Sequence, residues 1–172
     1  MKIAQLLEND LVLKMNPDES GRLPPDLPSG LPDTVNGKFV CSAMDLTSLK
    51  GCPRVVHGNF SCAGNKLTSL EYCPIHVDKD FICVNNNITS LKNIHQYITF
   101  IGGDFRCLGN PITSHILGLM MIRIDGAIIT NLGDDGEDIN AVLNKWKNQG
   151  RKGVMGAMKE LIDLGYESLA QI

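Results

Sequence analysis

The amino-acid sequence predicts an α/β solenoid: a short array of repeats with one parallel strand per repeat and a helical cap at each end. Two observations lead to this class. Three residue types recur together at a spacing of 21 residues, and the chain after the last copy changes to the apolar spacing of helices. A fixed period of about 20 to 50 residues indicates units that stack on one another. The recurring residues are Phe39, Phe60 and Phe81, then Cys41, Cys62 and Cys83, and then Leu46, Leu67 and Ile88.

Each copy follows the frame F-x-C-x-x-N-x-[LI]-T-S-L. The first three copies read GKFVCSAMDLTSLKGCP, GNFSCAGNKLTSLEYCP and KDFICVNNNITSLKNI, and the fourth reads GDFRCLGNPITS. The fourth copy follows at a spacing of 24 residues, so we expect a bulge or a longer loop near residues 98–101. Met44 replaces the asparagine in the first copy, and the other copies have Asn65, Asn86 and Asn110.

The frame has a physical explanation. Because side chains alternate along a strand, F-x-C places both residues on one face, and stacked copies form a phenylalanine ladder and a cysteine ladder in the core. An amide three residues after the cysteine can bond backbone groups in the tight turn that leaves the strand. One unit cannot bury its own apolar face, so at least three units have to stack.

This frame resembles the leucine-rich repeat, L-x-L-x-x-N-x-L, with Phe and Cys in the two strand positions. It is most similar to repeats of the bacterial type and to those encoded by tailed bacteriophages, over about residues 22–115. The resemblance is specific for the fold and says little about function, because this fold hosts many binding roles. It implies a phage-encoded protein that binds a host protein, such as a defence factor, and inhibits or redirects it.

The chain is expected to have three parts. Residues 1–20 form an N-terminal helical cap, residues 21–131 form the solenoid, and residues 132–172 form a C-terminal helical hairpin. The first helix is inferred from apolar residues at helical spacing within residues 2–12. These residues are Ile3, Leu6, Leu7 and Leu11.

The hairpin is inferred from two amphipathic stretches. In the first, Asp134 or Asp135 is expected to cap the start and Gly150 to mark the end; the second covers about residues 154–164 and ends at Gly165. Before the hairpin, Arg123 is expected to lie in a further strand, which would belong to a divergent last repeat. The apolar stripes are Ile139, Val142, Leu143 and Trp146 in the first helix, and Val154, Met158, Leu161 and Ile162 in the second.

Residues 16–36 hold five of the eight prolines, which excludes a regular helix or a central strand. We interpret this segment as a degenerate half-repeat that covers the open end of the solenoid, and a plain linker is the alternative. The half-repeat is favoured by four positions at the repeat spacing. They are Gly30, Pro32, Val35 and Gly37, which precede Gly51, Pro53, Val56 and Gly58 by 21 residues.

The sequence contains no catalytic constellation, so we do not expect an enzyme, a cofactor or a metal site. Neither a nucleophile elbow, a phosphate loop nor a paired-histidine metal motif is present. The six cysteines occupy two repeat positions without CxxC spacing, and we expect them to be core thiols. The histidines occupy different repeat positions and are expected to be solvated. They are His57, His76, His95 and His115.

The charge and hydropathy of the chain limit which partners and which cellular compartment we expect. The net charge is −3, so no overall basic field attracts nucleic acid or an anionic membrane. No apolar run approaches the roughly 20 residues of a membrane helix, and the start lacks the pattern of a secretory signal. Reduced core thiols are typical of a cytoplasm. We therefore expect a cytoplasmic protein, located in the host cytoplasm if it is phage-encoded.

The predicted partner-binding face is formed by the residues that flank Phe and Cys and point away from the core. Apolar side chains beside charges are the composition of a protein interface. Two alternatives remain open: a terminal element folds over this face, or the face is a surface that tolerates such residues. The residues of the predicted face are Val40, Ser61, Asp80, Ile82, Val84, Asp104, Arg106 and Leu108.

Two rival functions remain. A basic cluster in the C-terminal helices, Lys145, Lys147, Arg151 and Lys152, is a possible second surface that contacts nucleic-acid phosphates. Acidic residues flank this cluster, and the helical spacing buries Trp146, its one aromatic neighbour, so nucleic acid is not favoured. A structural or assembly component would use exposed solenoid ends, which the expected caps argue against. The oligomeric state is left open.

Overall fold

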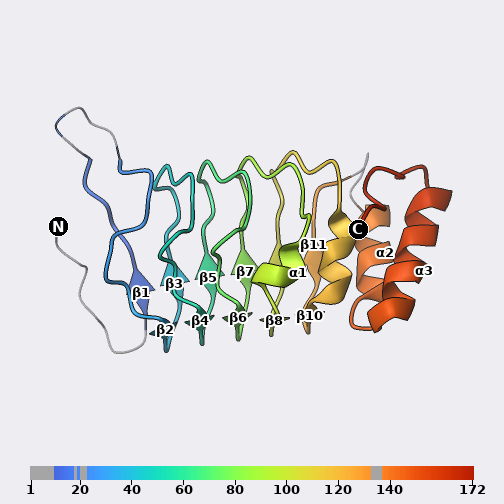
Figure 1. Ribbon diagram of the computed structural model, residues 1–172, viewed down its shortest axis with the longest axis horizontal. Helices are drawn as coiled ribbons and strands as arrows, with labels where there is room; N and C mark the ends of the chain where they lie inside the picture. The colour runs from blue at the N-terminus through green and yellow to red at the C-terminus, as the bar shows by residue number, and fades with distance from the viewer. Residues whose placement is uncertain (1–9, 18, 20–22, 133–136) are drawn as a thin grey trace.

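The computed structural model describes residues 10–17, 19, 23–132 and 137–172. The described chain winds into a stack of coils, with strands side by side along the long axis and helices at the C-terminal end (Figure 1). Two parallel sheets run along the stack. The six-stranded sheet contains β1 (Leu11–Val12), β3 (Phe39–Val40), β5 (Phe60–Ser61), β7 (Phe81–Ile82), β9 (Phe105–Arg106) and β11 (Ile128–Ile129). The five-stranded sheet contains β2 (Thr34–Val35), β4 (Val55–Val56), β6 (His76–Val77), β8 (Phe100–Ile101) and β10 (Arg123–Ile124).

The two parallel sheets, with consecutive strands in contact, and the C-terminal helices agree with the coarse expectation of an α/β fold, but the expectation of one strand per repeat is wrong. Each coil contributes a strand to both sheets, and consecutive coils pair in register, as Val56 does with Val77. The second strand forms because a β-branched residue stands four positions before the first residue of the next strand and faces the core. These buried residues are Val35, Val56, Val77, Ile101 and Ile124.

The expected phenylalanine ladder forms the centre of the core. Neighbouring ring centroids are 6.0 Å apart between Phe39 and Phe60, 4.8 Å between Phe60 and Phe81, and 5.5 Å between Phe81 and Phe105. All four rings are fully buried. Truncation of one such ring to alanine, as in Phe60→Ala, costs about 3–5 kcal/mol because the neighbouring rings cannot close the void.

The asparagine ladder also has the expected role in the turn. The Nδ2 group of Asn65 donates to the carbonyl oxygens of Cys41 and Cys62 at 2.9 Å. Its Oδ1 accepts from the backbone N–H groups of Met44 and Leu46 at 2.9 and 3.0 Å. Each amide therefore joins its own coil to the preceding one. By the same spacing, an asparagine at position 44 would accept a hydrogen bond from the backbone N–H of residue 25. Residue 25 is a proline without an N–H, which explains why position 44 holds a buried methionine instead.

Left-handed backbone recurs at two places in each coil. One set precedes the ladder asparagine, with positive φ at Ala43, Gly64, Asn85 and Gly109. The other set lies on the return path, where the residues are Gly30, Gly51, Tyr72, Asn93 and His115. Glycine adopts this conformation without strain, and Asn and His are enriched in it. Tyr72, at φ 65°, is the bulky member of the second set.

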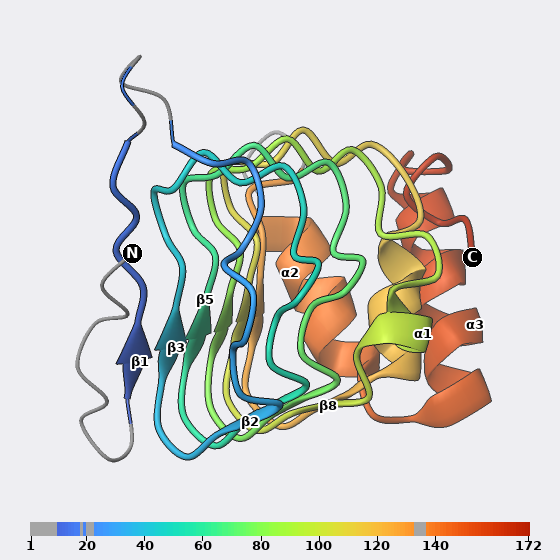
Figure 2. The same cartoon turned by 60° about the vertical axis from the view of Figure 1, so that its left-hand side comes forward.

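The three additional residues before the fourth copy lie in α1 (Ile94–Tyr97), a single helical turn on the outside of the coil (Figure 2). Of the two expectations near residues 98–101, the longer connection is found directly before them, in α1, and no bulge forms, because Phe100 and Ile101 pair regularly with His76 and Val77. A helical turn is short for its number of residues, so it takes up additional chain without moving the strand that follows.

At the C-terminal end, η1 (Ile116–Met121), α2 (Glu137–Trp146) and α3 (Gly150–Asp163) close the array. The expected hairpin is confirmed in outline, but Gly150 begins α3 and does not end α2. Gly165 ends α3 as expected, with φ 84° and its N–H on the carbonyl oxygen of Ile162 at 2.9 Å. The inward stripe of α2 is buried at Ile139, Val142 and Leu143. In α3 the prediction for Ile162 is wrong, since its side chain is 45% exposed.

The N-terminal end differs from the expectation. Leu11 and Val12 form a strand that pairs with Phe39 and Val40, so the predicted helix is wrong at these residues, and residues 1–9 lie outside the described chain. Asp134 and Asp135, the expected caps of α2, lie outside it as well. Thr34 and Val35 pair with Val55 and Val56, as expected of a half-repeat. In the described ranges, no helix has the length and apolar character needed to cross a membrane.

Candidate functional site

The outer face of the six-stranded sheet carries a continuous row of half-buried side chains. Strand pairing places them side by side, one from each strand, while the preceding Leu, Phe or Ile of each strand points into the core. This sheet forms one long side of the stack in Figure 2. The row consists of Val12, Val40, Ser61, Ile82, Arg106 and Ile129.

A second row lies two residues further along each strand and adds apolar surface over β7 and β9. Val84 is half-buried and Leu108 is 36% exposed. Because side chains two residues apart share a face, Val84 and Leu108 lie beside Ile82 and Arg106. Between β3 and β5 the face is more polar, and the hydroxyl oxygens of Ser42 and Ser61 are 2.8 Å apart. The apolar part of the face is therefore centred on Ile82, Val84 and Leu108.

The charged residues expected to rim this face have a structural role that the sequence did not reveal. Oδ1 of Asp80 accepts from the backbone N–H of Asp104 at 2.9 Å, and Oδ1 of Asp104 accepts from that of Ala127 at 2.8 Å. Their other oxygens contact Arg106, at 3.6 Å from Asp80 and 2.8 Å from Asp104. The two carboxylates thus hold the next coil and neutralise Arg106, so the cluster presents no free positive charge to a partner.

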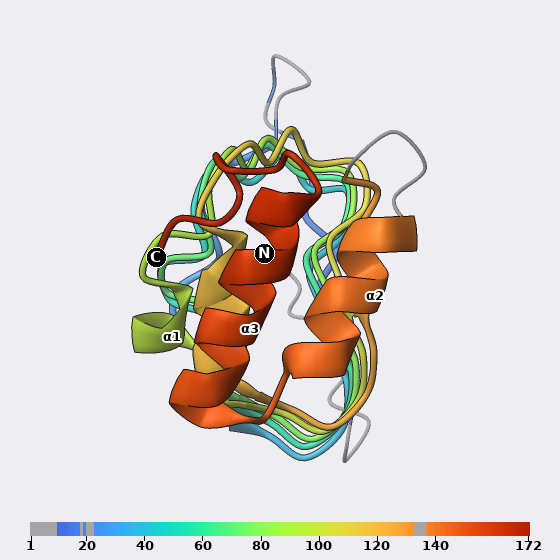
Figure 3. The same ribbon diagram turned by 90° about the vertical axis from the view of Figure 1, so that its right-hand side faces the viewer.

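Among the described elements, η1, α2 and α3 lie at the C-terminal end of the stack, α1 lies on the outside of a coil, and none of them is seen over the face of the six-stranded sheet (Figures 1 and 3). The alternative in which a terminal element covers this face is therefore not seen in the described part of the chain.

Three asparagines of the hairpin bind the last strands through their side-chain amides. Asn144 accepts from the N–H of Ile128 at 2.8 Å and donates to its carbonyl at 2.8 Å. Asn140 binds Thr130 in the same way, at 2.9 and 3.0 Å. Asn148 binds Ile124 of the other sheet, at 3.0 and 2.6 Å. Together these amides take the place of a further strand at both sheet edges, a role that their four-residue spacing would have suggested.

The basic residues proposed as a second surface are not brought together as one patch. Lys145 forms an ion pair with Glu160 and lies 5.1 Å from the centre of the Trp146 ring. Lys147 donates to the carbonyl oxygen of Gly126. Arg151 and Lys152 are exposed in the first turn of α3. Two of the four cations are thus engaged within the fold.

The five-stranded sheet brings two histidines together, which sequence reasoning missed because they occupy different repeat positions. Asp78 accepts hydrogen bonds from His57 at 2.8 Å and from His76 at 2.7 Å. The bond from His57 is the main cause that holds the pKa of Asp78 below its ordinary value. His76 also lies 4.7 Å from the ring of Phe100, and Arg123 covers that ring at 5.3 Å. These side chains come together because the second strands of neighbouring coils, β4, β6 and β8, pair side by side.

The cysteines are packing residues, as expected. All six are free thiols, and five are buried while Cys52 is half-buried. Burial raises the pKa of the Cys41 and Cys107 thiols to about 12, so the reactive thiolate is disfavoured. Within the described ranges, no group of three or more His, Cys, Asp or Glu residues is arranged to hold a metal ion.

Comparison with known proteins identifies no relative: no protein-family model, curated protein or solved structure matches the chain.

Proposed function

We propose that the chain is a non-enzymatic module that binds another protein through the outer face of the six-stranded sheet. The observation that carries the proposal is the apolar centre at Ile82, Val84 and Leu108, which no described element covers. Regularly spaced side chains on a rigid sheet suit recognition of a protein surface, because little conformational entropy is lost when the partner binds. Aliphatic residues in the middle of the face would supply the desolvated part of the interface.

The resemblance of the repeats to phage-encoded ones extends this proposal. The partner would then be a host protein in the host cytoplasm, such as a defence factor that the chain inhibits or redirects. Binding without catalysis acts stoichiometrically, so the chain would have to reach a concentration comparable with that of its target.

Two observations favour a protein partner over the rivals. Nucleic-acid binding through the C-terminal helices loses support, because Lys145 and Lys147 are engaged with Glu160 and Gly126. Assembly through the C-terminal end of the stack loses support, because asparagine amides occupy the backbone groups of the last strands. A free row of cations or an open edge at these last strands would have favoured the rival functions.

The experiment is affinity capture from a nuclease-treated lysate of the host cell, with wild type and the double variant Ile82→Asp/Leu108→Asp. A control variant, Thr34→Asp/Val55→Asp, places the same charge on the other sheet. We expect wild type and the control to retain one protein in a 1:1 ratio and the sheet-face variant to lose it. Equal melting temperatures would show that all three chains are folded.

Retention of the same protein by the folded sheet-face variant would contradict the proposed interface. If a parallel capture from untreated lysate recovers nucleic acid alone, and the treated lysate gives nothing, the result would favour the basic helices. A purified candidate partner should then be titrated by calorimetry, where the sheet-face variant is expected to bind at least about tenfold more weakly, or about 1.4 kcal/mol.

A further inference from the structure

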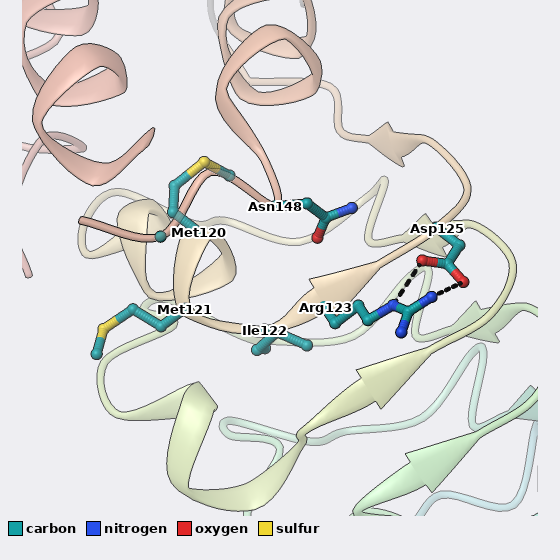
Figure 4. A pocket seen from close by; sticks show the side chains of 7 residues that line it. Met120, Met121, Ile122, Arg123, Asp125 and Asn148 are labelled. Carbon is teal, nitrogen blue, oxygen red and sulfur yellow. Dashed lines mark hydrogen bonds and ion pairs between the residues drawn. The ribbon is translucent and has the colours of Figure 1, made fainter. Parts of the chain in front are cut away.

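A second apolar surface lies in the C-terminal cap, far from the outer face of the sheet. The end of η1, the start of α3 and the tail of the chain line a hollow of about 540 Å³. An adjoining hollow of about 510 Å³ shares Met120, Met121 and Gly150 with it and continues to Arg123 and Asp125 (Figure 4). We call the two hollows together the methionine groove. Its apolar lining comes from Met120, Met121, Ile122, Val154, Met155 and Ile172.

The side chains at the mouth of the groove are unusually exposed for their type. Met121 is 50% exposed, and Met155 and Ile172 are each 56% exposed. A contiguous apolar surface of this kind is typical of an interaction site. Methionine is unbranched and polarisable, so it adapts to side chains of different shape. The groove therefore suits aliphatic side chains of a partner.

The charge around the groove is positive on its α3 side. Arg151 lines the groove and Lys152 follows it, both in the first turn of α3, which contains no acidic residue. Gln149, at the N-cap, makes no side-chain bond to the first turn. The helix dipole is positive at this end, and cations there are unfavourable unless an anion is bound nearby. The first turn of α3 thus presents charge and N–H donors that its own side chains do not satisfy.

We propose that the methionine groove docks an acidic amphipathic segment of a partner protein. An aliphatic side chain of that segment enters between Met121 and Met155, and a carboxylate meets Arg151 and the first turn of α3. A symmetric contact between two copies of this chain would bring the same cations together across the interface, which disfavours self-association. The site is independent of the sheet face, so each can fail without the other.

The test uses two short synthetic helical peptides, one with Leu and Glu on adjacent faces and one with Lys in place of each Glu. Binding is measured by fluorescence anisotropy and by NMR of ¹³C-labelled methionine methyl groups. We expect only the acidic peptide to bind and to shift the signals of Met121 and Met155. Arg151→Glu and Met155→Ser should each weaken binding about tenfold or more. Ile162→Ser is the matched control, because Ile162 is exposed on the same helix outside the groove.

Several outcomes would overturn the proposal. They are equal binding of the lysine peptide, equal loss of affinity in Ile162→Ser, or no methionine shift on binding. Vesicles of phosphatidylserine that shift the same signals more strongly than the peptide would assign the groove to an anionic membrane. Concentration-dependent sedimentation that Met155→Ser abolishes would assign it to a second copy. Circular dichroism of each variant confirms that α3 is intact before binding is compared.

Discussion

The side-chain amide of Asn144 binds the backbone of Ile128 twice, with Oδ1 on its N–H and Nδ2 on its carbonyl oxygen, both at 2.8 Å. A neighbouring parallel strand would satisfy the same two groups. Asn140 and Asn148 repeat this contact on either side along the hairpin, at Thr130 and Ile124. The C-terminal edge of each sheet, at β11 and β10, is thereby closed by side chains, which removes a template for pairing with another chain there.

Removal of the asparagine contacts should therefore destabilise the protein and expose the edge of the sheet. We expect Asn140→Ala/Asn144→Ala to lower the free energy of unfolding by about 1–3 kcal/mol for each edge residue left without its partners. The variant should also self-associate, as measured by sedimentation velocity. Asn87→Ala, at an exposed position of the third repeat, is the control and should remain unchanged. A variant that stays monomeric would show that the edge is protected by other means.

Within the array, Asn65 needs both its donor and its acceptor atoms. In Asn65→Asp the carboxylate would face the carbonyl oxygens of Cys41 and Cys62, and burial would raise its pKa. Because a raised folded pKa favours the protonated form, the variant should be less stable at pH 8 than at pH 5, relative to wild type. Urea unfolding at both pH values measures this. Equal destabilisation at the two pH values would show that the carboxyl group is not confined between the carbonyls.

Tyr72 is expected to strain the return turn, since it holds φ at 65° where other coils have Gly, Asn or His. Tyr72→Gly should raise the free energy of unfolding by about 1 kcal/mol, because glycine relieves this strain and the exposed ring loses little packing. Tyr72→Ala removes the same ring but retains a Cβ, so it should not share the gain. Chemical denaturation of wild type and the two variants measures these free energies of unfolding. Equal stability of the Gly and Ala variants would exclude strain at Tyr72.

Asp78 should titrate below its ordinary pKa of 3.8, since His57 and His76 both donate to it. A lowered folded pKa contributes stability above the ordinary value, and this stability is lost as the pH falls through the folded pKa. The contribution should stay below about 1 kcal/mol because the groups are exposed. In His57→Ala the carboxyl titration followed by NMR should move up toward 3.8. An unmoved midpoint would show that the bond does not persist in solution.

The repeat, its core and its turns were predictable because each depends on residues that recur in the same frame. Phe60 and Asn65 have counterparts 21 residues away, so their ladders follow from spacing alone. The second strand of each coil was missed, since two residues with one β-branched side chain are too short for a recognisable alternation. At the N-terminus, Leu11 fits helical spacing as well as a strand, and only pairing with Phe39 decides between them.

The candidate site was predictable only in its apolar part. Alternation along the strands places Ile82 and Leu108 on the outer face. The roles of Asp80 and Asp104 depend on the distance between coils, which brings each carboxylate within reach of the next backbone N–H. Likewise, the groove around Met121 forms only when η1 and α3 come together, and no local pattern reports that contact.

The short helix α1 shows that a coil can contain additional residues without a change in the pairing of its strands. Three additional residues are taken up there, while β8 keeps its pairing with β6 and with β10. The outer corner of a coil is thus a position where a peptide can be grafted, so that the scaffold displays a foreign loop without redesign of its interior.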